Sequence, residues 1–153
     1  MNEIVSKTVL ISGGAGAMGK LISEYINTRN DFKISGIHDP NYEGNDYKLY
    51  NDLIDIKEDL IIEFSPASVV NKNIEKLLKS ESDIIIGSSG LSVELLLNLK
   101  NEAKNRKIIV IPNFSVGAAY QKLFSLALSE NFSTIGIVEK HHSNKQDAPS
   151  GTA

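Results

Sequence analysis

The chain has 153 residues, of which 41% are hydrophobic and 23% charged, proportions typical of a folded globular domain and not of a disordered chain. The formal net charge is only −3, so composition gives no reason to expect nucleic acid or a membrane as a partner. There is no cysteine, which excludes disulfides, thiolate metal ligands and cysteine nucleophiles and fits a cytoplasmic location. Residues 1–7 show no signal-peptide pattern, and every apolar run is far too short to span a bilayer.

Short apolar runs rich in Ile and Val alternate with segments of helical period. Runs of the first kind predict strands buried on both faces, and therefore parallel, over Thr8–Ile11, Phe32–Ile37, Leu60–Phe64, Asp83–Ile86 and Ile108–Ile111. Segments of helical period between and after these strands predict four helices, each with one buried stripe. The predicted buried residues are Met18, Leu21, Ile22, Tyr25 and Ile26 in the first, Val70, Ile74, Leu77 and Leu78 in the second, Leu96, Leu99 and Ala103 in the third, and Tyr120, Leu123, Phe124 and Ala127 in the fourth. Ser92 is the predicted N-cap of the third helix. This order predicts an α/β fold, a Rossmann-like doubly wound parallel sheet with right-handed crossovers.

Two segments depart from this alternation. Residues 41–58 are polar, and we expect a loop with a turn or two of helix. After Asn131 the pattern changes, because Thr134–Glu139 predicts a strand that runs into a dense polar segment. We therefore predict a dinucleotide-binding domain over residues 1–130 and the incomplete beginning of a second domain over residues 131–153.

The turn between the first predicted strand and the first predicted helix is rich in glycine. Gly14, Gly16 and Gly19 satisfy the pattern G-x-G-x-x-G, and Gly13, Gly16 and Gly19 satisfy the related pattern G-x-x-G-x-x-G. Glycine allows positive φ and lets the backbone approach a pyrophosphate, and the helix N-terminus that follows attracts phosphate. In this strand–turn–helix context the pattern favours dinucleotide binding over the alternative of a simple tight turn.

Asp39 lies at the end of the second predicted strand, 20 residues after Gly19, where a carboxylate can accept hydrogen bonds from ribose hydroxyls. Two alternatives remain open. The sequence His38-Asp39-Pro40 is also compatible with an ordinary Asp-Pro turn, and His38 could take the place of the acid. No arginine directly follows this strand, which favours NADH over NADPH as the cofactor.

Three further strand ends carry small and polar residues, in the segments Glu63–Pro66, Gly87–Gly90 and Pro112–Ser115. Ligands of open parallel sheets gather at the carboxyl ends of the strands, and Asn113 could bind a carboxamide there. Each segment alone is equally compatible with a plain turn, since such turns favour these residue types. Together, beside a dinucleotide-binding turn, they favour a site for the nicotinamide and its ribose.

The last fifteen residues concentrate polar chemistry. His141, His142 and Lys145 supply proton donors and positive charge, and Ser150 could cap a helix whose first N–H groups, at Gly151 and Thr152, hold a carboxylate. An anionic substrate would then be clamped by the lysine while a histidine delivers a proton. The alternatives are half of a metal site, for which adjacent histidines have poor geometry, and a solvated loop without a role. Ser150 lacks the G-x-S-x-G elbow of a hydrolase nucleophile.

The same segment, Glu139–Ala153, is similar to the motif E-x-H-H-x-x-K-x-D-A-P-S-G-T-A of the 4-hydroxy-tetrahydrodipicolinate reductases and matches it at every specified position. The glycine-rich turn, Gly87–Gly90 and Asn113-Phe114-Ser115 resemble other signatures of this family, in the same order. The resemblance implies reduction of 4-hydroxy-tetrahydrodipicolinate to tetrahydrodipicolinate by NADPH or NADH, with loss of water, in lysine and diaminopimelate biosynthesis. It also implies a second α+β domain for substrate binding and for assembly into a homotetramer.

The resemblance assigns roles by position. His141 would be the general acid, Lys145 would stabilise developing charge, and substrate carboxylates would be bound by His142, Ser150, Gly151 and Thr152. The residues implied in cofactor binding are Gly13, Gly14, Ala15, Gly16, Ala17, Met18, Asp39, Gly87, Ser88, Ser89, Ile111, Pro112, Asn113 and Phe114. No metal site and no nucleic-acid or membrane partner is implied, and the substrate would be a small dicarboxylate.

The chain departs from the family pattern in places. Glu63 stands where the motif D-F-(S/T)-x-P has aspartate and the spacer before Pro66 is missing, and Gly117-Ala118-Ala119 lacks the usual Val-Asn. Members of the family also continue well past residue 153. The alternatives are therefore another dehydrogenase of this architecture, acting on an amino-acid-like substrate, and a non-catalytic NAD(P)-binding fragment.

Overall fold

The structure, a computed structural model, describes residues 6–111, 113–136, 138 and 140. The chain divides into two compact units, Met1–Ile111 and Pro112–Ala153. The domain boundary expected at residues 130 and 131 remains a prediction. None of the helices that the structure describes is long and apolar enough to cross a membrane.

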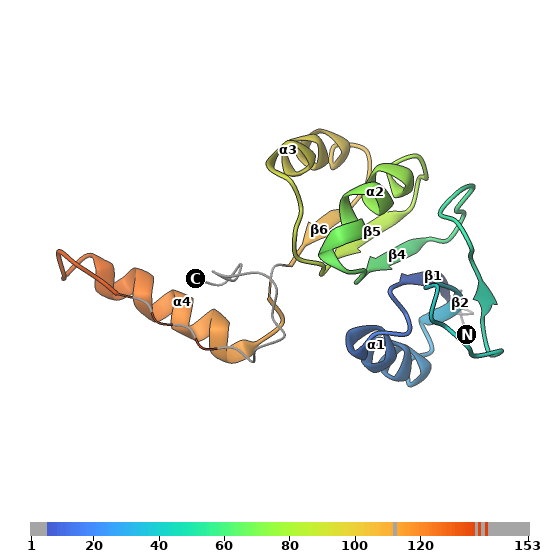
Figure 1. Cartoon of the computed structure of the whole chain (residues 1–153), viewed down its shortest axis with the longest axis horizontal. Helices are drawn as coiled ribbons and strands as arrows, with labels where there is room; N and C mark the ends of the chain where they lie inside the picture. Colours follow the sequence, from blue (N-terminus) through green and yellow to red (C-terminus); the bar gives the residue numbers. More distant parts are fainter. Residues whose placement is uncertain (1–5, 112, 137, 139, 141–153) are drawn as a thin grey trace, which may run out of the picture. The chain divides into compact units, whose positions relative to one another are not determined.

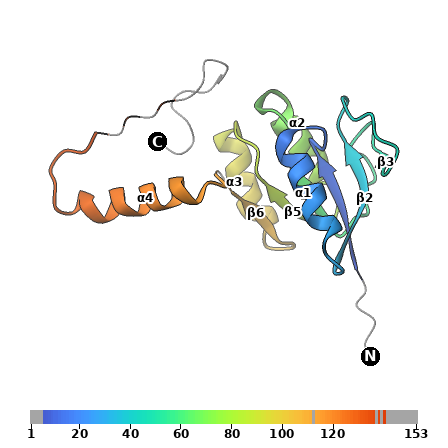
Figure 2. The same cartoon turned by 90° about the horizontal axis from the view of Figure 1, so that it is seen from below.

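The described part of the first unit is a parallel sheet with helices on both faces (Figures 1 and 2). Its elements are β1 (Lys7–Ser12), α1 (Ala17–Asn27), β2 (Phe32–His38), β3 (Lys48–Leu49), β4 (Leu60–Glu63), α2 (Ala67–Leu77), β5 (Asp83–Ile86), α3 (Val93–Glu102) and β6 (Ile108–Val110). All five predicted strands are present, each within one or two residues of the predicted bounds. Every pairing between neighbouring strands is parallel, so the predicted pairing mode is confirmed.

The strands follow the order β3-β2-β1-β4-β5-β6, and the direction of winding reverses between β1 and β4. With right-handed crossovers this order places α1 on one face and α2 and α3 on the other, as Figure 1 shows. A separate apolar core fills each face. The core under α1 contains Val9, Ile11, Ile26, Ile34, Ile37 and Ile62, and that under α2 and α3 contains Leu10, Leu53, Ile56, Ile61, Val70, Ile74, Leu77, Ile84, Ile86, Leu95 and Leu99. The predicted Rossmann-like doubly wound fold is confirmed.

The buried stripe of α1 is narrower than predicted. Ile26 is buried and Met18 and Ile22 are half-buried, whereas Leu21 and Tyr25 are 58% and 60% exposed. The prediction of burial is therefore wrong for these two residues. A helix lying on one sheet buries the row i, i+4, i+8, and the neighbouring row is covered only where a further element adjoins it.

The next two helices show the same principle. In α2 the predicted residues Val70, Ile74 and Leu77 are completely buried, and each such side chain contributes about 1.5–3 kcal/mol. The fourth predicted residue, Leu78, is the C-cap and is only half-buried. In α3 the buried pair is Leu95 and Leu99.

At the ends of α3 one prediction holds and another fails. The Ser92 hydroxyl accepts a hydrogen bond from the Leu95 amide at 3.2 Å, so the predicted N-cap is confirmed. Leu96 is 37% exposed and Ala103 follows the last turn as an exposed C-cap residue, so the prediction of their burial is wrong. The buried residues of α3 begin at Leu95 and not at the predicted Leu96. We attribute the difference to the capped first turn, which sets the side of the helix that faces the sheet.

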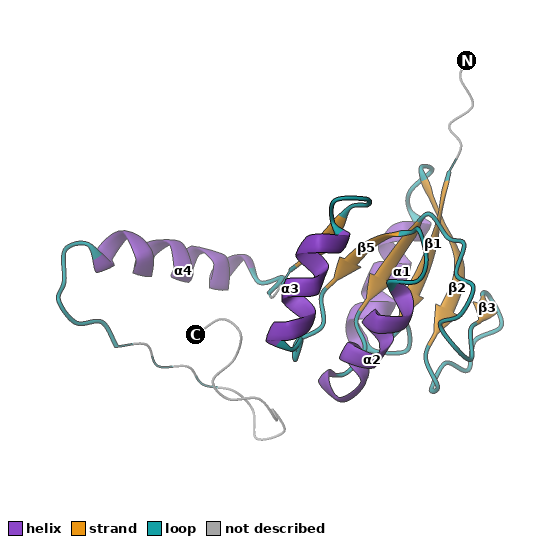
Figure 3. Cartoon of the chain, turned by 90° about the horizontal axis from the view of Figure 1, so that it is seen from above, coloured by secondary structure: helices purple, strands orange, loops and turns teal. Residues whose placement is uncertain are grey.

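The segment 41–58 contains the short strand β3 and no helical turn, so the helix expected there is wrong (Figure 3). The strand pairs with β2, and the Tyr50 ring lies where a side chain on Gly36 would otherwise project. Leu53 and Ile56 are buried in the core beneath α2. Long-range packing of three apolar side chains thus holds a segment whose local composition is polar.

Strand β6 pairs only with β5 among the described strands, and Ile109 and Val110 are 51% and 37% exposed. The prediction that every strand is buried on both faces is therefore wrong for this edge strand. Burial on both faces requires a helix on each side, and the described helices of the first unit cover only one side of β6.

The second unit contains α4 (Val116–Ser129), whose first turn is capped by the Ser115 hydroxyl bound to the Ala118 amide at 3.3 Å. This helix buries none of its residues, so the burial predicted for the stripe Tyr120, Leu123, Phe124 and Ala127 is wrong. The described residues of 134–138 form no strand, which contradicts the strand predicted at Thr134–Glu139. Helices and strands alike need a second layer or a neighbouring strand, and the described part of this unit offers neither.

Candidate cofactor site

The carboxyl ends of three strands meet where the winding of the sheet reverses. Ser12 at the end of β1 is in register with His38 of β2 on one side and with Glu63 of β4 on the other. The glycine-rich turn therefore leaves the sheet between the ends of β2 and β4. In open α/β sheets this crevice is where ligands bind.

Two glycines of the turn are required by the packing of the chain itself. Gly13 has φ of 83°, and a Cβ there would approach the carbonyl carbon of Phe64 to 2.6 Å. The Gly13 amide also donates to the His38 carbonyl at 2.8 Å, which fixes the start of the turn against β2. A Cβ on Gly19 would collide with the Gly13 carbonyl oxygen, so this residue lets α1 pack closely on the turn.

Gly16 has a different environment. Its backbone has φ of −69°, and the nearest atom to a Cβ there would be the Gly13 carbonyl oxygen at 3.3 Å, so a side chain would require a small shift of that oxygen and not the rearrangement needed at Gly13 or Gly19. Gly16 is also the N-cap of α1 and gives the helix no side-chain cap. The first-turn N–H groups of a helix have no intrahelical acceptors, so those of Ala17 and Met18 remain available to an anion. An exposed glycine that lines a cavity beside uncapped N–H groups fits the pyrophosphate of a dinucleotide.

Asp39 is held by two backbone amides. Its Oδ2 accepts from the Ala15 amide at 3.0 Å and its Oδ1 from the Asn41 amide at 2.9 Å. The second bond is the Asx turn that the Asp-Pro alternative implies, and the first ties the carboxylate to the glycine-rich turn. A carboxylate has about four acceptor positions, so ribose hydroxyls can still bind. The neighbouring His38 is engaged through Nδ1 with the Tyr50 carbonyl oxygen at 2.8 Å.

A cavity of about 730 Å³ opens at this point, within the range of typical cofactor sites. Its lining residues are Gly13, Ala15, Gly16, His38, Asp39, Pro40, Asn41, Leu49, Tyr50, Asn51, Phe64, Ser65, Pro66, Val69 and Asn73. The cavity thus brings the glycine-rich turn together with Asp39 and with the turn after β4. Gly14, Ala17 and Met18 belong to the same turn and helix start but do not line it.

Sequence reasoning missed several residues of this cavity, among them Tyr50 and Asn73. Tyr50 lies in the segment expected to be a loop with a turn or two of helix, and as one of three tyrosines there, with Tyr42 and Tyr47, it has no local signal that distinguishes it. Asn73 is 8% exposed on α2, and its amide donates to the Ser65 hydroxyl at 3.0 Å. A polar residue within the otherwise apolar stripe of α2 was the signal that could have identified it.

The turn after β5 lies on the far side of β4 from the glycine-rich turn. Ser88 is buried and its hydroxyl donates to the Glu63 carbonyl oxygen at 3.2 Å, whereas Ser89 is exposed. The Ile111 amide, just beyond β6, donates to the Ile86 carbonyl at 2.8 Å. The predicted cofactor residues Gly87, Ser88, Ser89 and Ile111 thus lie at the correct edge of the sheet but outside the cavity lining.

The remaining predicted residues belong to the second unit. Asn113 Oδ1 accepts from the Ser115 amide at 2.7 Å, and Phe114 is 46% exposed. Pro112, His141, His142, Lys145, Ser150, Gly151 and Thr152 lie outside the residues that the structure describes. Within the described residues no three side chains of the metal-ligating types gather.

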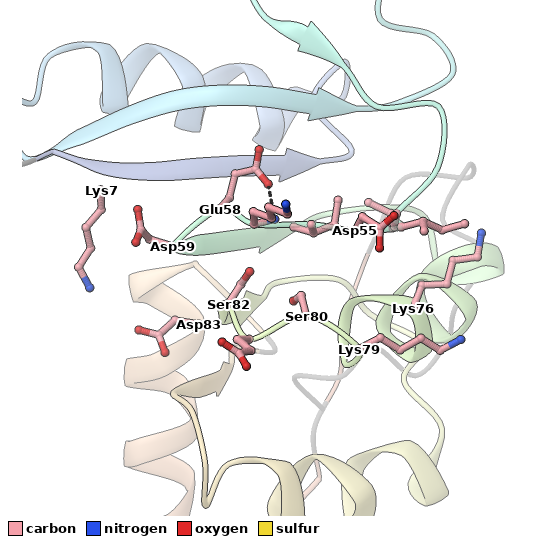
Figure 4. Close-up of a pocket in the computed structure, with 14 residues that line it drawn as sticks. Lys7, Asp55, Glu58, Asp59, Lys76, Lys79, Ser80, Ser82 and Asp83 are labelled. Carbon is pink, nitrogen blue, oxygen red and sulfur yellow. Dashed lines mark hydrogen bonds between the residues drawn. The ribbon is translucent and has the colours of Figure 1, made fainter.

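A second cavity, of about 840 Å³, lies at the amino ends of the strands and is drawn in Figure 4. Both lysine and carboxylate side chains line it. Asp59, one of them, is occupied in holding β1, since its Oδ2 accepts from both the amide and the hydroxyl of Thr8 at 2.7 Å. This cavity is the larger of the two, but it lies at the edge opposite to the switch point, so the smaller cavity is the better candidate for cofactor binding.

Comparison with known proteins agrees with this geometry. The family model described as dihydrodipicolinate reductase, N-terminus, matches residues 7–114, which include the whole described sheet. The chain belongs to the dihydrodipicolinate reductase family. The matched part of these reductases is the domain that binds NADH or NADPH.

Relatives in this family share a third of their sequence with the chain. A 4-hydroxy-tetrahydrodipicolinate reductase of Coxiella burnetii is 34% identical over 148 residues, 95% of this chain and 59% of the relative. One from Dictyoglomus turgidum is 32% identical, over 96% of this chain and 60% of the relative. A dipicolinate-bound dihydrodipicolinate reductase from Paenisporosarcina superposes with a TM-score of 0.73 at 25% identity, over 97% of this chain and 63% of that one. The chain thus spans about three fifths of the length of the curated relatives it matches.

Proposed function

We propose that the chain binds NADH or NADPH in the cavity at the switch point and forms the cofactor-binding part of a 4-hydroxy-tetrahydrodipicolinate reductase. The observation that carries the proposal is the exposed Gly16, which lines the cavity together with Asp39 and lies at the uncapped start of α1. A cavity that served only the fold would have no need for a glycine at this position. Family membership supplies the choice of cofactor and reaction.

Each part of the cofactor has a counterpart in the chain. The first turn of α1 would hold the pyrophosphate, and Asp39 would accept from the adenosine ribose. The nicotinamide half would extend past Ser65 toward the ends of β4 and β5. The bound cofactor supplies a hydride, and the chain contributes binding, orientation and exclusion of water.

The substrate assignment depends on the last residues of the chain. We propose that His141 is the general acid, that Lys145 stabilises developing charge, and that His142, Ser150, Gly151 and Thr152 bind the carboxylates of the substrate. The motif that these residues share with the family supports these roles, as does the dipicolinate bound to the reductase from Paenisporosarcina. A dicarboxylate substrate, a second domain from residue 131 and a cytoplasmic location belong to the same proposal, as does a homotetrameric assembly of the full-length reductase.

Titration of the chain with NADH, followed through the emission of the bound cofactor, tests the proposal directly. The chain has no tryptophan, so protein fluorescence will not obscure the signal. We expect binding of NADH. We also expect pyridine-2,6-dicarboxylate to strengthen it, because the dicarboxylate would bind next to the nicotinamide ring, in the adjacent substrate position. Absence of NADH binding would refute the cofactor assignment. Binding of NADH without any effect of the dicarboxylate would support a cofactor-binding module without the proposed substrate site.

A further inference from the structure

Glu63 is a carboxyl group buried at the switch point for which the proposed chemistry has no use. It ends β4, where it is in register with Ser12 of β1 and Ile86 of β5, and it is completely buried. Its Oε2 has no hydrogen-bond partner among the described residues. A buried carboxyl oxygen without a partner is costly, so a fold that needed only to pack this position would be served better by an apolar side chain.

The other carboxyl oxygen of Glu63, Oε1, and its backbone carbonyl oxygen connect two turns. Its Oε1 accepts from the Ser65 amide at 2.6 Å, in the turn after β4, and lies 3.5 Å from the Ser88 hydroxyl, in the turn after β5. Its carbonyl oxygen accepts from the Gly87 amide at 2.9 Å and from the Ser88 hydroxyl at 3.2 Å. One residue therefore determines how these two turns lie relative to each other.

The network continues toward the cavity. The Ser65 hydroxyl lies 3.0 Å from the Ser12 hydroxyl and accepts from the Asn73 amide at 3.0 Å. Both Ser65 and Asn73 line the cofactor cavity, although Glu63 does not. The carboxyl group thus lies directly behind the cavity wall on the β4 side, the side away from Asp39.

We infer that Glu63 is a positioning residue for the nicotinamide half of the cofactor, which it serves by fixing the turn at Ser65 against the turn at Gly87 and Ser88. The inference rests on the proposed function. Asp39 marks the adenosine side of the crevice, and the two turns that Glu63 joins lie on the other side of the switch point, where the second mononucleotide half of a dinucleotide binds. Buried polar networks of this kind specify one arrangement of the groups they join, at a cost in stability.

The test compares NADH with ADP, which has the adenosine and both phosphates but lacks the nicotinamide riboside. Glu63→Met replaces the carboxyl by an apolar chain of similar length, and Glu63→Gln keeps an acceptor for the Ser65 amide. For Glu63→Met we expect the Kd for NADH to rise roughly tenfold, as for the loss of one hydrogen-bonded contact, and the Kd for ADP to change less than about twofold. For Glu63→Gln both constants should stay within about threefold of the unchanged chain.

Thermal unfolding adds a readout that a merely structural role would not produce. Because Oε2 is unpartnered, Glu63→Met should unfold no more easily than the unchanged chain although it binds NADH less tightly. Asp59→Asn is the control, since Asp59 accepts from the amide and the hydroxyl of Thr8 at the amino ends of the strands, the edge opposite to the two turns. Asp59 lines the cavity at that edge and does not line the cofactor cavity. This control should lower stability and leave both Kd values within about twofold.

Equal weakening of NADH and ADP in Glu63→Met, or no weakening of NADH, would overturn the inference. If Glu63→Met fails to fold, Ser88→Ala removes the hydroxyl that joins the turn after β5 to Glu63. This variant should raise the Kd for NADH and leave the Kd for ADP unchanged. An unchanged Kd for NADH in Ser88→Ala would overturn the inference equally. The proposed function fails separately, if the unchanged chain binds no NADH.

Discussion

Alanine substitutions at Gly19 and Gly16 should affect different properties of the chain, the first its stability and the second its binding of NADH. A methyl group on Gly19 would collide with backbone atoms of Gly13 and Gly14, so Gly19→Ala should lose about 1–3 kcal/mol of unfolding free energy or more. A methyl group on Gly16 meets a single backbone oxygen at 3.3 Å, a tight contact that a small shift relieves, so Gly16→Ala should lose much less unfolding free energy than Gly19→Ala. It should nevertheless weaken NADH roughly tenfold or more, because the methyl takes the space of the pyrophosphate. Thermal unfolding and NADH titration of both variants check this, and normal NADH binding by Gly16→Ala would place the pyrophosphate elsewhere.

Asp39 should decide between the two forms of the cofactor. Its carboxylate is held by the Ala15 and Asn41 amides, and no lysine or arginine lines the cavity, so a 2′-phosphate would meet a fixed negative charge without a basic partner. We expect NADH to bind more tightly than NADPH. Asp39→Ser should lower the ratio of the two affinities at least about tenfold, since like-charge contacts cost several kcal/mol. Asp46→Ser removes an exposed carboxylate outside the cavity lining and should leave the ratio unchanged; a similar shift there would attribute the effect to general charge.

At the scale of elements, one carboxylate ties the 41–58 segment to the sheet. Glu58 Oε1 accepts from the Tyr50 hydroxyl at 2.6 Å and from the Ser35 hydroxyl of β2 at 3.1 Å. Burial is the largest influence and raises the pKa of Glu58, but hydrogen bonds from Tyr50, the backbone and Ser35 together hold that pKa below its ordinary value. The same segment carries β3 and four residues of the cavity lining, Asn41, Leu49, Tyr50 and Asn51, so this anchor supports the β2 side of the cofactor site.

The sign of the resulting pH dependence follows from that lowered pKa. A carboxylate whose pKa is lower in the folded than in the unfolded chain stabilises the fold above the unfolded pKa, and this stabilisation is lost as pH falls through the folded pKa. Glu58→Gln should therefore cost about 1–3 kcal/mol at pH 7, a difference that shrinks once the pH falls below about 4. Denaturant unfolding at several pH values measures it, with the exposed Glu24→Gln as the control. A difference constant down to pH 3 would mean that charge has no part in the anchor.

At the scale of the whole molecule, the sequence predicts what depends on local repetition. Parallel strands buried on both faces need unbroken apolar runs, so the order of strands and helices follows from the pattern, and the glycine spacing locates the turn. The helical period identifies which face of a helix is apolar, but it does not tell how much of that face the sheet covers. Leu21 and Tyr25 are therefore exposed although they belong to the apolar face of α1. Strand β3 and the place of Tyr50 depend on Gly36, more than ten residues away. The Glu63 network joins three strand ends, and no local pattern reveals such a contact.

Cofactor binding and proton transfer are assigned to separate parts of the sequence. The cofactor cavity is built entirely from residues before Asn113, whereas the residues proposed for proton transfer and substrate binding lie at and after His141. His141→Ala should therefore lower turnover about 10²–10⁴-fold, the contribution of a positioned general acid, while the Kd for NADH stays within about twofold. Lys145→Ala gives a readout independent of turnover, since it should weaken pyridine-2,6-dicarboxylate and leave NADH alone. If both variants instead lose NADH in proportion, the C-terminal segment supports the fold of the cofactor site, and its histidines have no separate chemical role.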